Sequence, residues 1–199
     1  MHGLFIVALW LAGAPITLAD THHGALSGCQ PPSTCDAAAV AEFTDRLQAY
    51  LSVRQEVARD LLAERLFDDP GEMLFVRDAL KRLIREARPY ARAGDLFTPR
   101  AAAAFRHIIA ATAAADRVDP KDFARELRAE RLPGAKPPAV NHSYDWRLGA
   151  WMWPSLLQAL PPLPPDLQYR IVDDDLVLID LRANLVVDIL EHALAADED

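Results

Sequence analysis

Apolar residues recur at steps of three and four positions through the first two thirds of the chain, the spacing of helices that bury one face. The first two stripes cover residues 36–66 and 71–92. Two further helices are predicted to begin after Thr98 and Asp119, because each is a capping residue that stands before a proline. The pattern therefore predicts a helical bundle over residues 36–131.

The periodicity is lost in the next part of the chain. Residues 132–138 read LPGAKPP, a composition that predicts a linker or a surface strap rather than a helix or strand. Residues 141–160 are rich in tyrosine and tryptophan, whose large apolar area predicts docking onto the bundle. A proline run follows at residues 161–165. Residues 132–165 are therefore predicted to form one strap rich in proline and aromatic residues.

The C-terminal part carries strand signals. Residues 168–172 and 176–180 are rich in β-formers, and Asp173, Asp174 and Asp175 between them favour a hairpin turn over a calcium loop. Residues 182–195 are apolar over a wide arc and predict a helix. We therefore predict a mainly α fold: a helical bundle of about four helices with a C-terminal β-hairpin followed by a helix. The hairpin and last helix form a subdomain over residues 166–199.

The N-terminal residues form an uncharged apolar segment. Residues 4–12 supply an apolar core of the length that a signal sequence needs, and small residues precede a cleavage position after Ala19. Residues 1–19 are therefore predicted to be a signal peptide, with a buried N-terminal helix as the alternative. The run is shorter than the roughly 20 residues of a membrane span, and Pro15 interrupts it.

The segment that follows, residues 20–35, is predicted to be extended and contains both cysteines. In an exported chain, Cys29 and Cys35 are predicted to form a disulfide. Residues 26–29 also have the pattern of a bacterial lipobox, which would place a lipid on Cys29. The predicted location is therefore periplasmic or secreted, with a lipoprotein anchored at Cys29 as the alternative.

Two segments carry a family resemblance. The first is the GDLFTP turn at residues 94–99, and the second is the stretch PPLPPDLQYRIV at residues 161–172, continued by DLRANLVVD at residues 180–188. In these segments the chain resembles a group of uncharacterised exported bacterial proteins. The resemblance implies export and no assigned activity.

Composition and charge narrow the classes of partner. The chain of 199 residues is 51% apolar and 25% charged, an ordinary globular mixture, and its net charge is −8. An acidic chain lacks the basic footprint of a nucleic-acid-binding protein, so no nucleic-acid partner is predicted. Membrane contact is predicted only through the signal peptide or a lipid on Cys29. Arginines gather between Arg77 and Arg106, but interleaved acidic residues indicate a solvated helix surface.

The familiar catalytic motifs are absent from the sequence, which has no GxSxG elbow, no HExxH pair and no glycine-rich phosphate loop. We predict no catalytic residue and no cofactor. If cleavage follows Ala19, the amine, two amides and the imidazole of His22 suit a square-planar Cu(II) or Ni(II) site, with His23 assisting. A histidine that occurs there by chance is the alternative.

The strap holds a second candidate site, in which an imidazole, a carboxylate and aromatic rings lie close in sequence. Its residues are His142, Asp145, Trp146 and Trp151. Such groups can line a ligand pocket or a hydrolytic site, and the alternative is a polar loop that caps helices.

A third candidate is the pair of Asp188 and His192. If residues 182–195 are helical, these two side chains lie one turn apart, and the carboxylate can tune the imidazole as a base or a metal ligand. An ordinary surface contact between the two is the alternative.

Together these observations favour an exported, non-enzymatic binding or interaction module. A short hairpin is marginal alone, so a protein partner or a second copy is predicted to bind through residues 168–181. The alternative is a small hydrolase, or a ligand- or metal-binding protein, that uses the region of His142, Asp145 and the tryptophans.

Overall fold

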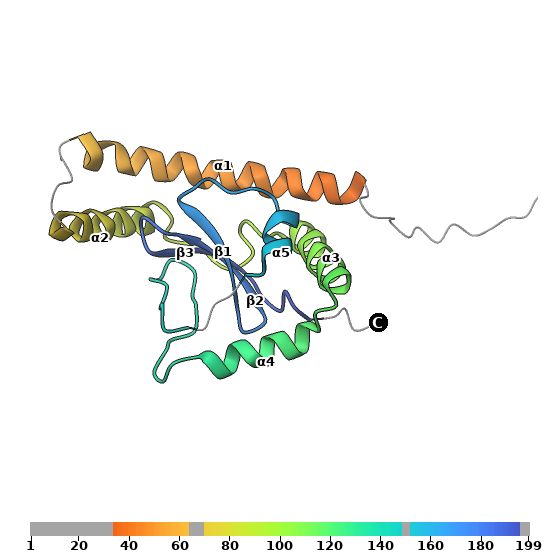
Figure 1. Cartoon of the computed structure of the whole chain (residues 1–199). Coiled ribbons are helices and arrows are strands. Elements are labelled where there is room, and N and C mark those ends of the chain that lie inside the picture. Colours follow the sequence, from red (N-terminus) through yellow and green to blue (C-terminus); the bar gives the residue numbers. More distant parts are fainter. Residues whose placement is uncertain (1–33, 64–69, 149–151, 196–199) are drawn as a thin grey trace, which may run out of the picture.

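The computed structural model describes residues 34–63, 70–148 and 152–195 (Figure 1). Its helices are α1 (Thr34–Ala63), α2 (Pro70–Ala87), α3 (Pro99–Asp116), α4 (Pro120–Glu130) and α5 (Pro154–Ala159). Its strands are β1 (Leu167–Val172), β2 (Asp175–Asp180) and β3 (Leu185–Leu190). None of the helices in the described ranges is long and apolar enough to cross a membrane.

The starts of α3 and α4 show how local sequence sets the helix boundaries. The Thr98 hydroxyl accepts a hydrogen bond from the backbone N–H of Ala101 at 3.3 Å, and the Asp119 carboxylate accepts one from Lys121 at 2.8 Å. A proline stands at the start of each helix, where a missing N–H costs nothing. These helices therefore begin where the capping pairs predict.

The predicted C-terminal helix is wrong, and so is the mainly α fold class with a β-hairpin followed by a helix. Residues 185–190 form β3 instead, so the described residues contain a three-stranded antiparallel sheet. All six residues of β3 are buried, and a strand covered on both faces is apolar at almost every position. That continuous pattern has the same wide apolar arc as a buried helix. Three of the six residues are β-branched, which favours the strand: Val186, Val187 and Ile189.

The strand order is β1-β2-β3, with β2 in the middle. Leu167 pairs with Asp180 across β1 and β2, and Leu176 pairs with Leu190 across β2 and β3. The second ladder shifts register between Leu178 and Ile179, which leaves Val187 as an extra residue of β3.

Helices cover one face of the sheet (Figure 1). An aromatic cluster joins α1, α3 and β1, with Phe43 and Phe105 ring centroids 4.8 Å apart and Phe97 and Phe105 centroids 5.1 Å apart. Tyr169 of β1 lies against the same cluster, 6.1 Å from Phe105. These rings bury large apolar area and fix α1 and α3 on the sheet.

The first part of the predicted strap covers the other face. Tyr144 and Leu148 pack there against side chains of all three strands, among them Val177 of β2. The strap also pairs with the edge of β3, because Val186 accepts a hydrogen bond from Asn141 N–H and donates one to the His142 carbonyl, each at 2.9 Å. Both faces of the hairpin are thus covered within the chain, and partner binding through residues 168–181 stays a prediction.

Asp188 joins β3 to the GDLFTP turn. Its carboxylate is fully buried and accepts hydrogen bonds from the N–H groups of Gly94 at 2.8 Å, Leu96 at 2.6 Å, Phe97 at 2.7 Å and Ile189 at 2.8 Å. Burial raises the pKa of the Asp188 carboxyl, and the N–H donors oppose that rise. The motif is thus a backbone cradle for one buried carboxylate.

Candidate ligand-binding groove

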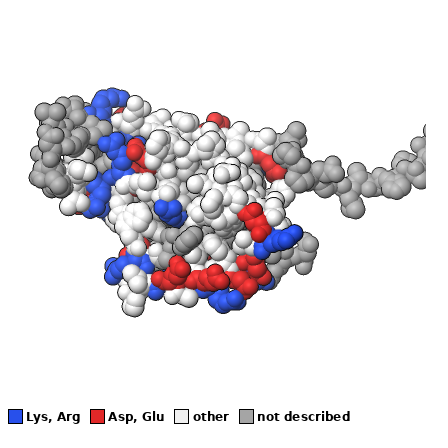
Figure 2. Space-filling view, viewed as in Figure 1, with Lys and Arg blue, Asp and Glu red and all other residues white. Residues whose placement is uncertain are grey.

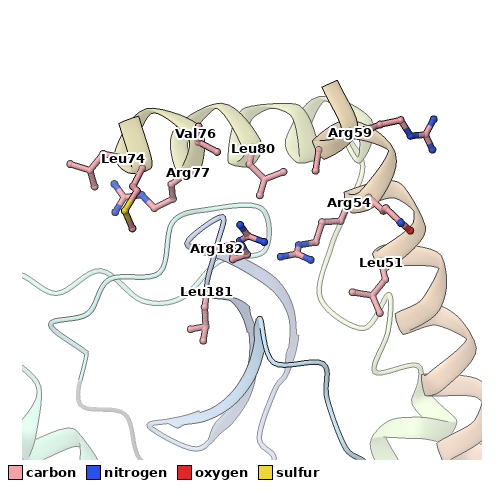
Figure 3. A pocket seen from close by; sticks show the side chains of 12 residues that line it. Leu51, Arg54, Arg59, Leu74, Val76, Arg77, Leu80, Leu181 and Arg182 are labelled. Carbon is pink, nitrogen blue, oxygen red and sulfur yellow. The ribbon is translucent and has the colours of Figure 1, made fainter. Parts of the chain in front are cut away.

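A groove of about 970 Å³ lies between α1 and α2, with the residues that follow β2 forming its third side (Figure 3). This volume is within the usual range for small-molecule sites. Its apolar lining comes from both helices and from the segment after β2. The apolar residues are Leu51, Ala58, Met73, Leu74, Val76, Leu80 and Leu181.

Helical spacing explains the two long walls. Leu51 and Ala58 are two turns apart and share one face of α1, while Val76 and Leu80 are one turn apart on α2. Ala58 and Leu80 belong to the buried core at the base of the groove. The groove is therefore an extension of the helix-helix contact toward solvent.

The outer end of the groove is apolar and exposed. Met73 is 60% exposed and Leu74 53% exposed, and both line the groove. The next residue, Phe75, is also largely exposed. Contiguous exposed apolar residues beside a cavity are typical of a ligand-binding or interaction surface.

The charged lining of the groove is basic. Four arginines line it, and the lining holds no aspartate or glutamate among the described residues. The four are Arg54, Arg59, Arg77 and Arg182. Figure 2 shows Lys and Arg side chains gathered over α2 and the adjoining end of α1, whereas Asp and Glu follow the edge formed by α4. The groove is thus locally positive on a chain whose net charge is −8.

Arg54 is held by a buried network behind the groove. Its Nε atom lies 2.6 Å from a carboxylate oxygen of Asp180, and its Nη2 atom donates to Asp166 at 2.8 Å. Asp180 is fully buried and also accepts hydrogen bonds from the Tyr50 hydroxyl at 2.8 Å and the Ala183 N–H at 3.0 Å. This network fixes the Arg54 guanidinium at the groove wall.

The same network sets the charge states of Arg54 and Tyr50. Burial acts to lower the pKa of the Arg54 guanidinium, but the hydrogen bond to Asp166 and the charge of Asp180 outweigh it, so the pKa is raised. Burial, and then the charge of Asp180, raise the pKa of the Tyr50 hydroxyl well above its ordinary value. Arg54 therefore stays charged and Tyr50 stays a neutral donor.

Arg182 lies opposite Arg54 and is less constrained. Its Nη1 atom is 3.8 Å from Asp166, beyond hydrogen-bond distance, and its side chain is 52% exposed. Figure 3 shows the side chains of Arg54 and Arg182 turned toward each other below Leu80. The Arg182 guanidinium therefore has donors available for a ligand.

The described lining of the groove is apolar and basic. The described residues around the groove include no serine, cysteine, histidine, lysine or carboxylate, so they supply no nucleophile and no general acid or base near neutral pH. Apolar walls with a few fixed polar groups are typical of a site that recognises an amphiphilic molecule.

The structure does not assemble the predicted strap site. The His142 ring lies 3.0 Å from the Val140 carbonyl, whereas Asp145 is paired with Arg147 at 2.7 Å. Trp146 is 57% exposed and packs edge-on against Tyr144. The Arg147 hydrogen bond lowers the pKa of the Asp145 carboxyl well below its usual range. The fourth predicted residue, Trp151, lies outside the described residues.

The other predicted sites at the N-terminal end are not described. His22, His23 and Cys29 lie outside the described residues, and Cys35 is described only through its backbone at the start of α1. The proposed metal site and disulfide therefore stay predictions.

The predicted pairing of Asp188 with His192 is wrong, because β3 replaces the helix that would bring them together. Asp188 is buried in the cradle described above, and the His192 ring contacts Asp174 at 2.9 Å. That contact raises the pKa of the His192 imidazole. Asp174, Asp175 and His192 form a cluster whose ligand atoms lie close enough to hold a metal ion. The two aspartates are half-buried and His192 is exposed, and Arg128 already pairs with Asp174 at 3.1 Å.

The groove was hard to predict from the sequence, because its walls come from three separate segments. One signal was the apolar run of Met73, Leu74 and Phe75, in which consecutive residues cannot all face the core of one helix. The second signal was that Arg54 and Arg77 each lie beside the apolar stripe of a predicted helix.

A scan of protein-family models, a search of curated proteins and a search of solved structures each found no match. The resemblance noted from the sequence therefore stays a prediction.

Proposed function

We propose that this chain is a non-enzymatic binding protein whose ligand site is the groove between α1 and α2. The observation that carries the proposal is a cavity of about 970 Å³ with apolar walls and an exposed apolar mouth. Its described lining supplies binding groups and no catalytic ones. The alternative hydrolytic site in the strap gains no support, since His142 and Asp145 have separate partners.

The proposal includes a location outside the cytoplasm. It is supported by the apolar segment of residues 4–12, the small residues Thr17 and Ala19 before the predicted cleavage position, and two cysteines that suit an oxidising compartment. A protein in such a compartment has access to apolar molecules that leave or enter a membrane.

A neutral fluorescent probe tests the binding function. N-phenyl-1-naphthylamine gains fluorescence in apolar sites and carries no charge, so it reports the groove walls without the arginines. We expect saturable binding to the purified protein, and Ala58→Trp to weaken it about tenfold or more by filling the base of the groove. Ala41→Trp, on an exposed position of the same helix, is the matched control and leaves binding unchanged.

Ala58 is buried, so its replacement could also disturb the core. A second variant therefore changes an exposed residue of the groove. Leu74→Glu places a charge at the mouth of the groove, where the side chain is 53% exposed and the fold tolerates it. Both variants keep the circular dichroism spectrum of the unmodified chain. Equal probe binding in the unmodified chain, Ala58→Trp and Leu74→Glu would show that the probe binds elsewhere.

A further inference from the structure

We infer that the groove selects a free single-chain amphiphile that ends in a carboxylate, with its chain along the apolar walls and its carboxylate at Arg182. The inference rests on the proposed binding function and adds the chemical class of the ligand. It joins two features of one cavity, the apolar lining and the basic lining.

The position of the arginines favours an acidic head group. Arg54, Arg77 and Arg182 come from three separate segments of the chain, yet all line the same groove. A guanidinium next to low-dielectric walls attracts an anion more strongly than it would in bulk water. This local excess of positive charge is informative because the net charge of the chain is −8, so an average part of its surface is acidic.

The available donors favour a monoanion over a phosphate dianion. The Arg54 guanidinium is already paired with two carboxylates, since its Nε atom lies 2.6 Å from Asp180 and its Nη2 atom 2.8 Å from Asp166. These two negative charges offset the charge of Arg54 and part of the charge of Arg182. Asp78 contacts Arg77 at 3.3 Å. Arg182 is left with unshared donors in a planar fork, the geometry that binds one carboxylate through two N–H groups.

The shape of the site favours a single molecule over a bilayer surface. The arginines that face each other lie below Leu80, inside a cavity between two helices, rather than on a flat face (Figure 3). Met73 and Leu74 stand exposed at the mouth, where an apolar chain can enter. A surface that binds the headgroups of a bilayer would instead be expected to carry its arginines in a row on an exposed, flat face.

Competition among ligands of equal chain length tests the inference. Laurate, dodecanol, dodecyl phosphate and dodecyltrimethylammonium are titrated against bound N-phenyl-1-naphthylamine. The ionic ligands are kept below their micelle-forming concentrations and dodecanol below its solubility limit. We expect laurate to bind about tenfold or more tightly than dodecanol, the size of one charge-assisted hydrogen bond. Dodecyl phosphate binds more weakly than laurate, and the cationic ligand binds most weakly.

Arg182→Gln identifies the group responsible. It removes the charge from a half-exposed side chain and leaves the buried network of Arg54 in place. We expect it to bring laurate affinity to within about threefold of dodecanol affinity. The matched control is Arg125→Gln, an exposed arginine on α4 with an aspartate partner at 2.7 Å, which keeps the preference for laurate.

The outcomes separate this inference from the proposed function. Probe binding that depends on Ala58, with equal affinity for laurate and dodecanol, overturns the ligand class and keeps the groove. A preference for laurate that survives Arg182→Gln also overturns the assignment. Tighter binding of dodecyl phosphate, or binding to anionic vesicles without displacement of the probe, overturns it as well. Absence of any probe binding removes the proposed function itself.

Discussion

Replacing Asp188 by alanine removes the acceptor that holds the GDLFTP turn against β3. The N–H groups of Gly94, Leu96 and Phe97 then keep no partner, although they stay at the buried junction between the turn and the sheet. Each buried donor without an acceptor costs about 1–3 kcal/mol. Three such groups, partly relieved by water, give an expected loss of about 3–6 kcal/mol in the free energy of unfolding.

Urea unfolding followed by far-ultraviolet circular dichroism measures this loss. The expected loss is a large part of the usual 5–15 kcal/mol of domain stability, so the midpoint moves far toward zero urea. Asp95→Ala is the control: it lies in the same turn, is half-buried, and accepts one hydrogen bond from Arg92 N–H at 3.0 Å. It is expected to cost about 1 kcal/mol or less. A cost below about 1 kcal/mol for Asp188→Ala would refute the cradle as a source of stability.

Three further predictions follow from the core, the buried ion pair and the exposed histidine. Phe105→Ala, at a fully buried ring between helices and sheet, is expected to cost about 3–5 kcal/mol in urea unfolding. Arg54→Met leaves Asp180 charged and buried and is expected to cost about 3–5 kcal/mol, whereas Arg54→Met with Asp180→Leu costs less than the sum of the single changes. Asp174→Asn is expected to lower the pKa of His192 toward its ordinary value near 6.5, as read from proton NMR titration of the ring.

The direction of the His192 pKa shift sets the pH range in which the contact with Asp174 stabilises the fold. The pKa is raised in the folded chain, so the stabilising contact with Asp174 is fully present below about pH 6.5 and is lost as the pH rises through the folded pKa. An unchanged titration in Asp174→Asn would contradict the contact. Additive costs for the Arg54 and Asp180 substitutions would contradict their coupling.

Helix positions were predictable because local signals and packing agree there. Thr98 and Asp119 cap the helices that their sequence predicts, and the apolar stripe of α1 faces the core through Phe43 and Leu47. The third strand was missed for a physical reason: a strand buried on both faces has no alternation, so its period cannot be read from hydrophobicity. Asp188 within that apolar run was the one polar residue that needed an explanation.

The groove was harder to predict than the fold. Its charge was hidden by a net charge of −8 and by acidic residues that alternate with the arginines along α2. In space, Arg54 is held at the groove wall by Asp180, a residue 126 positions later in the sequence. No local pattern reports a contact of that separation, so the site appears only once the strands and helices are placed.

The most direct test of the groove as a ligand site is a map of amide chemical-shift changes in the isotope-labelled protein as laurate is added. We expect changes concentrated on the facing residues of α1 and α2 and on Leu181 and Arg182, with little change in α4. Changes centred instead on the strap around His142 and Trp146, or no change at concentrations below the micelle limit, would contradict this expectation.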